Sequence, residues 1–278
     1  MSLKCIKKMK ISILRSGSSG NCTLIQHNGC RILIDAGMSQ KRVKEVLEEV
    51  DLDPSKISAI VVTHMHSDHC NYSTLQICRK FGIELFVHQK NVAPLRSVLQ
   101  KGRCCDDLKV RTFNDLPFQI GTMVLKPFDI SHDAYVVTSG FNVSPESSDE
   151  IYLSYAADLG VFPDNLICHF QNSKTIVLES NHDSDLLWEN PRRPYIHKKR
   201  VAGEKGHLSN IQSADALIKI AKISARMPDN VILCHLSKDH NTPQLALDCV
   251  GARLEEQNIK LALHIAQRDQ RTPFFEII

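Results

Sequence analysis

The chain has 278 residues, of which 42% are hydrophobic and 23% are charged, and its net charge is +3. These proportions allow a sizeable core and exclude a strong overall field for nucleic acid or membrane binding. No apolar run approaches the ~20 residues of a membrane helix, and the N-terminus lacks the long apolar region of a signal peptide, so we expect a cytoplasmic protein without membrane contact.

The first third of the chain alternates strand and helix patterns. The expected strands cover residues 11–16, 22–27, 30–37, 59–63 and 84–88. Asn28-Gly29 predicts a tight hairpin turn between the second and third of these strands. Helical periodicity predicts a helix over 39–50, with Ser39 as its N-cap, and another over 73–82 that ends at a glycine.

The middle of the chain is rich in strand patterns, and the last third returns to alternation. The expected strands cover residues 118–130, 135–144, 150–158, 175–181, 231–237 and 260–267. The expected helices cover residues 209–222 and 242–257. Because both ends combine a β-rich part with strand–helix–strand alternation, we expect one α/β domain over 1–278, built as a four-layer αββα sandwich.

Ten cysteines are scattered along the chain, and none forms a CxxC pair. Disulfide frameworks belong to small secreted domains, so we expect reduced thiols buried in the core. Cys70 follows a histidine-rich stretch directly, which leaves a ligand role open for it.

The stretch VVTHMHSDH, residues 61–69, places three histidines and an aspartate directly after a buried strand. His64 and His66 alternate along an extended backbone, so both side chains can reach one metal ion. Asp68 and His69 follow after a turn and can reach a second position nearby. A polar loop that is rich in histidine by chance is the alternative, but this spacing of ligand types favours a metal site.

This stretch resembles the H-x-H-x-D-H signature of the metallo-β-lactamase superfamily. Later stretches resemble further landmarks of the family, in the family's order and at strand ends: LIDAG (33–37), SHD (131–133), AADLG (156–160) and CHLS (234–237). Four more resemble the YycJ (WalJ) subfamily: SGSSGN (16–21), ESNHD (179–183), GHLSN (206–210) and HLSKDHNTP (235–243). These are relatives of ribonuclease Z, and some are described as DNA exonucleases.

The resemblance implies the metallo-β-lactamase fold and a site for two divalent metal ions, Zn²⁺ or Mn²⁺, with iron as a further candidate. One ion would be bound by His64, His66 and His132, the other by Asp68, His69 and His235, and Asp158 would bridge both. Asp35 would orient a ligand histidine through a hydrogen bond. Two such ions share one water, lower its pKa and stabilise the charge that develops on the substrate.

The activity implied is that of a hydrolase in which a hydroxide between the ions attacks a phosphodiester. Nucleic acid, cut from an end, is the expected substrate. The expected catalytic residues are Asp68, Glu179 and His207. Glu179 and His207 occupy positions similar to those thought to assist protonation of the leaving group in ribonuclease Z. A capping role for His207 beside Ser209 is the alternative.

The segment 190–206 carries six basic residues against one acidic residue. As a loop it would track a phosphate backbone, with Tyr195 available to stack on a base; a solvated basic turn is the alternative. The expected substrate-binding residues are His182, Arg192, Arg193, Lys198, Lys199 and Arg200. His240 and Asn241 either line the pocket or belong to a solvated loop.

Two other functions are compatible with the same residues. One is hydrolysis of a small metabolite, such as a cyclic phosphodiester, a thioester or a lactone, and the other is a non-catalytic metal-binding module. The long tRNA-binding arm of ribonuclease Z has no obvious counterpart, so tRNA processing is not expected. The sequence leaves open the metal, the choice between DNA and RNA, the polarity of cleavage and the oligomeric state.

Overall fold

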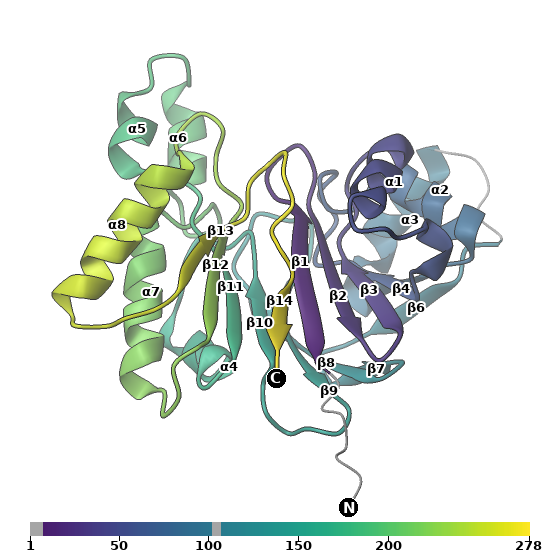
Figure 1. Ribbon diagram of the computed structural model, residues 1–278. Helices are drawn as coiled ribbons and strands as arrows, with labels where there is room; N and C mark the ends of the chain where they lie inside the picture. The colour runs from purple at the N-terminus through teal and green to yellow at the C-terminus, as the bar shows by residue number, and fades with distance from the viewer. Residues whose placement is uncertain (1–7, 102–106) are drawn as a thin grey trace, which may run out of the picture.

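The computed structural model describes residues 8–101 and 107–278 (Figure 1). Over these residues, two seven-stranded sheets pack face to face, and each carries helices on its outer face. The layers are therefore helix, sheet, sheet and helix. The αββα sandwich expected from the sequence is confirmed.

The first sheet has the strand order β14-β1-β2-β3-β4-β5-β6. Its strands are β1 (Met9–Arg15), β2 (Cys22–His27), β3 (Cys30–Ile34), β4 (Ala59–Val61), β5 (Glu84–His88), β6 (Val110–Phe113) and β14 (Phe275–Ile277). The strands from β3 to β6 run parallel. The hairpin of β2 and β3 turns at Asn28 and Gly29, as expected, and both residues have positive φ. Positive φ at both central positions is typical of a type I′ turn.

Three helices and two short 3-10 turns belong to this half: α1 (Gln40–Glu48), η1 (Pro54–Lys56), α2 (Tyr72–Phe81), η2 (Gln89–Asn91) and α3 (Val92–Lys101). Ser39 caps α1 by accepting a hydrogen bond from the backbone of Arg42, and Gly82 ends α2 at a φ of 67°. Both helix ends agree with the sequence patterns. The sequence patterns did not predict α3 or β6.

The second sheet has the order β13-β12-β11-β10-β9-β8-β7. Its strands are β7 (Phe118–Ile120), β8 (Met123–Ile130), β9 (Thr138–Pro145), β10 (Leu153–Ala156), β11 (Thr175–Glu179), β12 (Asn230–Cys234) and β13 (Leu263–Ile265). The single strand expected over 118–130 is wrong. The chain turns at Gly121, where φ is 54°, and β7 folds back antiparallel on β8. Glycine adopts this conformation at no steric cost, so it ends the strand.

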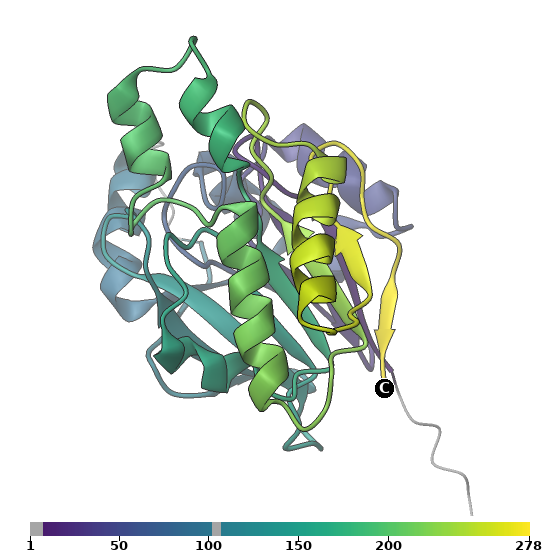
Figure 2. The same ribbon diagram turned by 90° about the vertical axis from the view of Figure 1, so that its left-hand side faces the viewer.

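The remaining helices are η3 (Asp164–Leu166), α4 (Ile167–Phe170), α5 (Ser184–Glu189), α6 (Tyr195–Val201), α7 (Asn210–Ile223) and α8 (Pro243–Glu256). Apolar residues of α4, α7 and α8 pack on the second sheet. Figures 1 and 2 show α5 and α6 as a pair that projects beyond this helical layer. The segment 190–206, expected as a loop, contains the helix α6.

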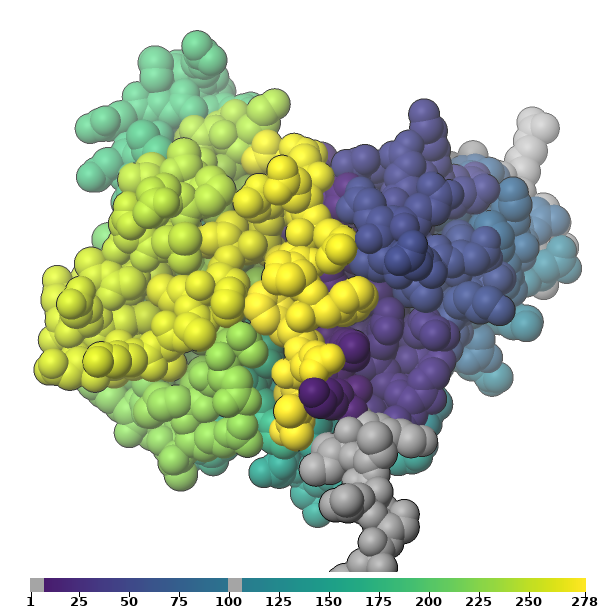
Figure 3. All heavy atoms as spheres, in the orientation of Figure 1, coloured from purple at the N-terminus to yellow at the C-terminus, as the bar shows by residue number. Residues whose placement is uncertain are grey.

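The largest buried side chains form a core between the sheets and one core under each helical layer. Ile13 and Phe141 lie between the sheets, Leu47 lies under the first helical layer, and Leu217 lies under the second. Figure 3 shows the C-terminal segment, in yellow, between the green half and the purple-to-blue half. This segment joins the halves, since β14 pairs with β1 of the first sheet.

The cysteines of the described residues are free thiols. Cys22, Cys30, Cys70, Cys78 and Cys234 are buried, as expected. Cys168, in the short α4, is exposed, and Cys249, in α8, is only half-buried, so the expected burial was wrong for these two residues. Cys5, Cys104 and Cys105 lie outside the described residues. Among the helices of the described residues, none has the length and apolar character needed to cross a membrane.

Candidate metal centre

The expected metal ligands come directly after strands of both sheets. In the first sheet, β4 leads into the loop from His64 to His69. In the second sheet, His132 follows β8, Asp158 follows β10 and His235 follows β12. These residues are distant in the chain, so the fold alone brings them together.

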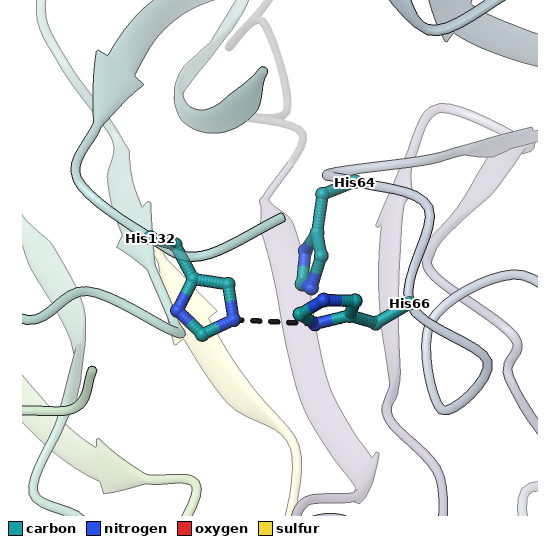
Figure 4. A group of neighbouring side chains, drawn as sticks. All are labelled: His64, His66 and His132. Atoms are coloured by element: carbon teal, nitrogen blue, oxygen red, sulfur yellow. Dashed lines mark hydrogen bonds between the residues drawn. The ribbon is translucent and has the colours of Figure 1, made fainter. Parts of the chain in front are cut away.

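Three histidines from the two sheets form the first group. One nitrogen each of His64, His66 and His132 lies within 4.8 Å of the other two. Nε2 of His132 is 3.3 Å from Nδ1 of His66, and Figure 4 shows the three rings turned toward one another. Nε2 of His64 is buried without a hydrogen-bond partner. Three imidazole nitrogens around one small space suit a first-row divalent metal.

Asp68, His69 and His235 form a second group, again with ligand atoms within 4.8 Å of one another. Asp158 lies between the two groups. Its Oδ2 atom is 2.8 Å from Nε2 of His69, and it also falls within 4.8 Å of a ring nitrogen of His64. The fold therefore brings together all seven expected ligands, with Asp158 in the middle.

Four of the ligand histidines are held in the same way: Nδ1 contacts a protein group, and Nε2 faces the shared space. The contacts of Nδ1 are with Thr63 Oγ1 for His64 (3.0 Å), Asp35 Oδ2 for His69 (2.7 Å), the Gly206 carbonyl for His132 (3.1 Å) and Glu179 Oε1 for His235 (2.8 Å). Such contacts orient metal-binding imidazoles and select their tautomer. The contact of Asp35 with a ligand histidine is the one expected from the sequence.

The charge balance of the site also fits divalent cations. Asp35, Asp158 and Glu179 are almost fully buried, and buried carboxylates need positive partners. Burial opposes ionisation of Asp158, but His235 and His69 hold its pKa well below the usual range. Burial likewise opposes charge on His235, but Asp158 and Asp68 raise its pKa to about 10. Histidine protons balance the carboxylates here, and metal ions would replace those protons.

Three polar atoms of the expected ligands stay buried without a hydrogen-bond partner: Nε2 of His64, Oδ2 of Asp158 and Nε2 of His235. Buried polar atoms are rarely left unpaired, because each costs free energy. These three belong to expected ligands of both metal positions. The residues present therefore fit divalent metal binding.

Glu179 and His207 form a pair beside the metal ligands. Oε1 of Glu179 is 2.8 Å from Nδ1 of His207 and 2.8 Å from Nδ1 of His235. Glu179 is fully buried, so it contacts these two rings and does not line the cavity. Burial opposes charge on His207, but Glu179 raises the pKa of its ring. The alternative of a capping role for His207 is wrong, because Ser209 caps α7.

Three of the seven non-glycine residues with positive φ among the described residues lie at this site. Asp35, Asp158 and His235 each have a φ between 55° and 60°, within two residues of a strand end. Non-glycine residues in this conformation cost about 1–3 kcal/mol each and persist where the surroundings hold them. Gly37 lies against the backbone of Asp68, and a Cβ atom at this position would be 1.9 Å from the carbonyl carbon of Asp68.

The loop between β1 and β2 supports the site through residues for which no role was expected. The backbone N–H of Asn21 donates to the carbonyl of Asp68 at 2.8 Å, and its Nδ2 atom lies 2.9 Å from Nε2 of His69. Ser16 Oγ accepts a hydrogen bond from the backbone N–H of His235 at 2.7 Å. The SGSSGN stretch was a signal for these contacts, but only as part of a family resemblance.

A cavity of about 750 Å³ opens over the cluster. Its walls include Asp68, Asp158 and His207, whereas His64 and His69 lie beneath them and are almost fully buried. The basic side chains that line it are Arg193, Arg200, Lys238 and Arg268. Two of these were expected from the segment 190–206, and Lys238 and Arg268 were missed because they stand singly in the sequence.

The other expected substrate-binding residues lie elsewhere. The Lys198 side chain is buried, and its ammonium donates to the Trp188 carbonyl in α5 at 2.6 Å. His182 is buried and joins a backbone bridge to Ser209, so it does not line the cavity. For Lys198 and His182 the geometry corrects the expectation.

Arg192 borders a smaller neighbouring cavity, and Lys199 is exposed beside the Tyr195 ring. Neither residue lines the metal cavity. Arg193 and Arg200 do line it, and each is paired with a carboxylate, Asp239 and Asp133 respectively.

Three residues with open roles are also located. Cys70 is buried in the core under α1 and α2 and is absent from the metal-ligand groups of the described residues. His240 lines the cavity. Asn241 is buried, and its amide donates to the carbonyl groups of Ser180 and Asn181, so it supports the loop after β11.

Comparisons with known proteins show the family and the fold of this chain. A family model described as the beta-lactamase superfamily domain matches residues 30–236. The exodeoxyribonuclease WalJ of Streptococcus pneumoniae is 28% identical over 279 aligned residues, which cover 96% of this chain and 98% of that protein. The exodeoxyribonuclease YycJ of Bacillus anthracis is 28% identical, covering 95% and 97%.

A solved structure gives the same result for the fold. The metallo-beta-lactamase fold protein YhfI of Bacillus subtilis has a TM-score of 0.69 at 14% identity and covers 97% of this chain and 99% of its own. At this identity the likeness concerns the fold alone.

Proposed function

This chain belongs to the beta-lactamase superfamily, and from that premise we propose that it is a metal-dependent phosphodiesterase that removes nucleotides from nucleic-acid ends. One observation carries the proposal. Seven ligand side chains converge at a cavity that is also lined by four basic side chains, and three of their buried atoms lack hydrogen-bond partners. A non-catalytic module would not need an open cavity over such a cluster.

The proposed role of each residue follows from where it lies in the site. His64, His66 and His132 would hold one ion, Asp68, His69 and His235 the other, and Asp158 both. Two divalent ions in such a site polarise a phosphodiester and lower the pKa of a water molecule. Asp35 and Glu179 act from behind, because each fixes the ring of a ligand histidine.

His207 is the proposed proton donor for the leaving oxygen. Its ring lines the cavity, and Glu179 holds Nδ1 and favours the charged imidazolium. Nε2 is then the atom that can transfer a proton. Glu179 is a positioning residue in this scheme, and His207 is the catalytic one.

The substrate class follows from the cavity walls. Arg193, Arg200, Lys238 and Arg268 offer positive charge to a phosphate backbone. Two full-length relatives carry the name exodeoxyribonuclease, which favours DNA as the polymer.

A small phosphodiester is the second candidate, because Arg193 and Arg200 are already paired with Asp239 and Asp133. That pairing lowers the net positive charge that a polymer would meet at the rim.

The test compares end-labelled single-stranded DNA, single-stranded RNA, a cyclic dinucleotide and a glutathione thioester, each with Mn²⁺ or Zn²⁺. Stepwise shortening of DNA from an end is the expected result. Turnover of the cyclic dinucleotide or the thioester without cleavage of DNA would reverse the ranking. Asp158→Asn is the control for a contaminating nuclease, because it removes a ligand oxygen charge and should be inactive on every substrate.

A further inference from the structure

A second cavity of about 760 Å³ adjoins the metal cavity. His66, Asp68 and Arg200 line both cavities, so they form a shared wall. A group bound in the second cavity would therefore lie beside the reacting phosphate. The volume falls in the range of about 300–1,000 Å³ that is usual for small-ligand pockets.

The second cavity has a different chemical character from the first. The metal cavity is lined largely by charged and imidazole side chains, whereas Met65, Pro94 and Val98 supply apolar surface here. Tyr135 lies at this cavity with 77% of its surface exposed. A large aromatic ring that is left this exposed beside an apolar hollow is available to a flat ligand.

The position of Tyr135 is tied to the metal centre. Its ring centroid is 6.1 Å from that of His66, with an angle of 74° between the ring planes. Tyr135 thus stands edge-on to an expected metal ligand, and its neighbour in the chain, Val136, does not line the cavity. A base stacked on Tyr135 would belong to the nucleotide beside the scissile phosphate and would not itself contain the reacting atoms.

Arg200 supplies charge at the boundary of the two cavities. Its Nε atom pairs with Asp133, which holds the guanidinium at the shared wall. An apolar hollow with an aromatic ring on one side and a cation plus metal ligands on the other matches a nucleotide. The base would enter the hollow, and the phosphate would stay at the wall.

We propose that the second cavity binds the nucleobase next to the scissile phosphate, stacked on Tyr135. The inference rests on the proposed function and specifies its substrate: a strand with at least one unpaired base at its end. Stacking tolerates every base, so the cavity selects for a nucleobase and not for a particular sequence.

The experiment measures cleavage of two end-labelled DNA strands, one natural and one with abasic residues at its last two positions. Tyr135→Ala should raise KM for the natural strand about tenfold and leave the abasic strand unchanged, because only the natural strand has a base to stack. Tyr135→Phe, which keeps the ring, and Val136→Ala, which is exposed outside the cavity, should behave like wild type. Equal effects of Tyr135→Ala on both strands, or no effect, would overturn the inference.

A binding measurement separates failure of the inference from failure of the proposed function. Binding of thymidine 5′-monophosphate to the metal-loaded protein is measured by equilibrium dialysis. Binding that Tyr135→Ala weakens, in a protein that cuts no DNA, would support the base site and reject the nuclease. DNA cleavage by a protein whose nucleotide binding is insensitive to Tyr135→Ala would reject the base site alone. An absence of both cleavage and binding would reject both.

Discussion

Oδ2 of Asp158 lies 2.8 Å from Nε2 of His69, yet this oxygen makes no hydrogen bond. The two atoms come from different sheets, and both are almost fully buried. The two atoms are at ion-pair distance but lack hydrogen-bond geometry, as is expected of two ligands that both face a shared cation. This relationship is the clearest sign in the fold that the cluster is arranged around cations.

Replacing His207 with alanine should slow cleavage of DNA by about 10²–10⁴-fold, because the leaving oxygen loses its proton donor. The nitrophenolate of bis-p-nitrophenyl phosphate leaves without a proton, so its release should change little. Rates on both substrates, with metal content as the control, check this. Equal slowing on both substrates would assign His207 to the metal site instead.

Replacing Gly37 with alanine should destabilise the fold by about 1–3 kcal/mol, because the added Cβ would overlap the Asp68 backbone. Gly251, in α8, is the matched control, since a Cβ there meets nothing within 4 Å. Gly251→Ala should instead stabilise the protein by roughly 0.5–1 kcal/mol. Urea denaturation measures both. Similar free energies of unfolding for the two variants would mean that the loop of Asp68 has room to shift.

Metal binding should release protons. The pKa of His235 is raised to about 10 in the metal-free fold, so its ring is charged at neutral pH and must lose a proton to bind an ion. Apparent metal affinity should therefore rise between pH 6 and pH 8. Titration calorimetry in two buffers with different ionisation enthalpies counts the protons released. Equal heats in both buffers would contradict the assignment.

The raised pKa of His235 also predicts how the stability of the metal-free protein changes with pH. The pKa of His235 is about 10 in the folded chain and about 6.5 in the unfolded chain, so binding of this proton stabilises the fold. The stabilisation is complete below pH about 6.5 and is lost as the pH rises through about 10. The metal-free protein should thus become less stable from pH 7 to pH 10, and the metal-loaded protein should not follow this trend.

Replacing Lys238 and Arg268 with alanine should weaken DNA binding and lower the slope of log affinity against log salt by about 1 per residue. Both side chains line the metal cavity. Lys41→Ala is the control, because this side chain on α1 is 88% exposed and does not line the cavity. Fluorescence anisotropy over a series of salt concentrations gives the slopes. An unchanged slope would place the DNA path away from these residues.

The outcome for the basic segment shows why local patterns mislead. Lys198 and Lys199 are adjacent in the sequence, so charge alone treats them alike. Helix α6 turns Lys198 inward to the Trp188 carbonyl and leaves Lys199 exposed. That difference depends on the position of the Trp188 carbonyl in α5, which the composition of residues 190–206 does not specify.

Among the proposed metal ligands, only the cluster from His64 to His69 indicated a metal site by its own spacing after a strand. The other ligands were expected because His64, His132, Asp158 and His235 occur in the same order as the ligands of the metallo-β-lactamase superfamily. Supporting residues such as Ser16 and Asn21 could not be assigned, because a serine and an asparagine in a Gly/Ser turn have many ordinary roles. The single-domain boundary over 1–278 stays a prediction.

The most direct test of the account is a crystal structure with anomalous diffraction, from protein equilibrated with Mn²⁺ or Zn²⁺ at neutral pH. The account predicts two metal peaks, one among His64, His66 and His132 and one among Asp68, His69 and His235, both in contact with Asp158. The Asp158→Ala protein should lose at least half of its bound metal in the same conditions. An absence of metal at these residues, or one ion that does not touch Asp158, would contradict it.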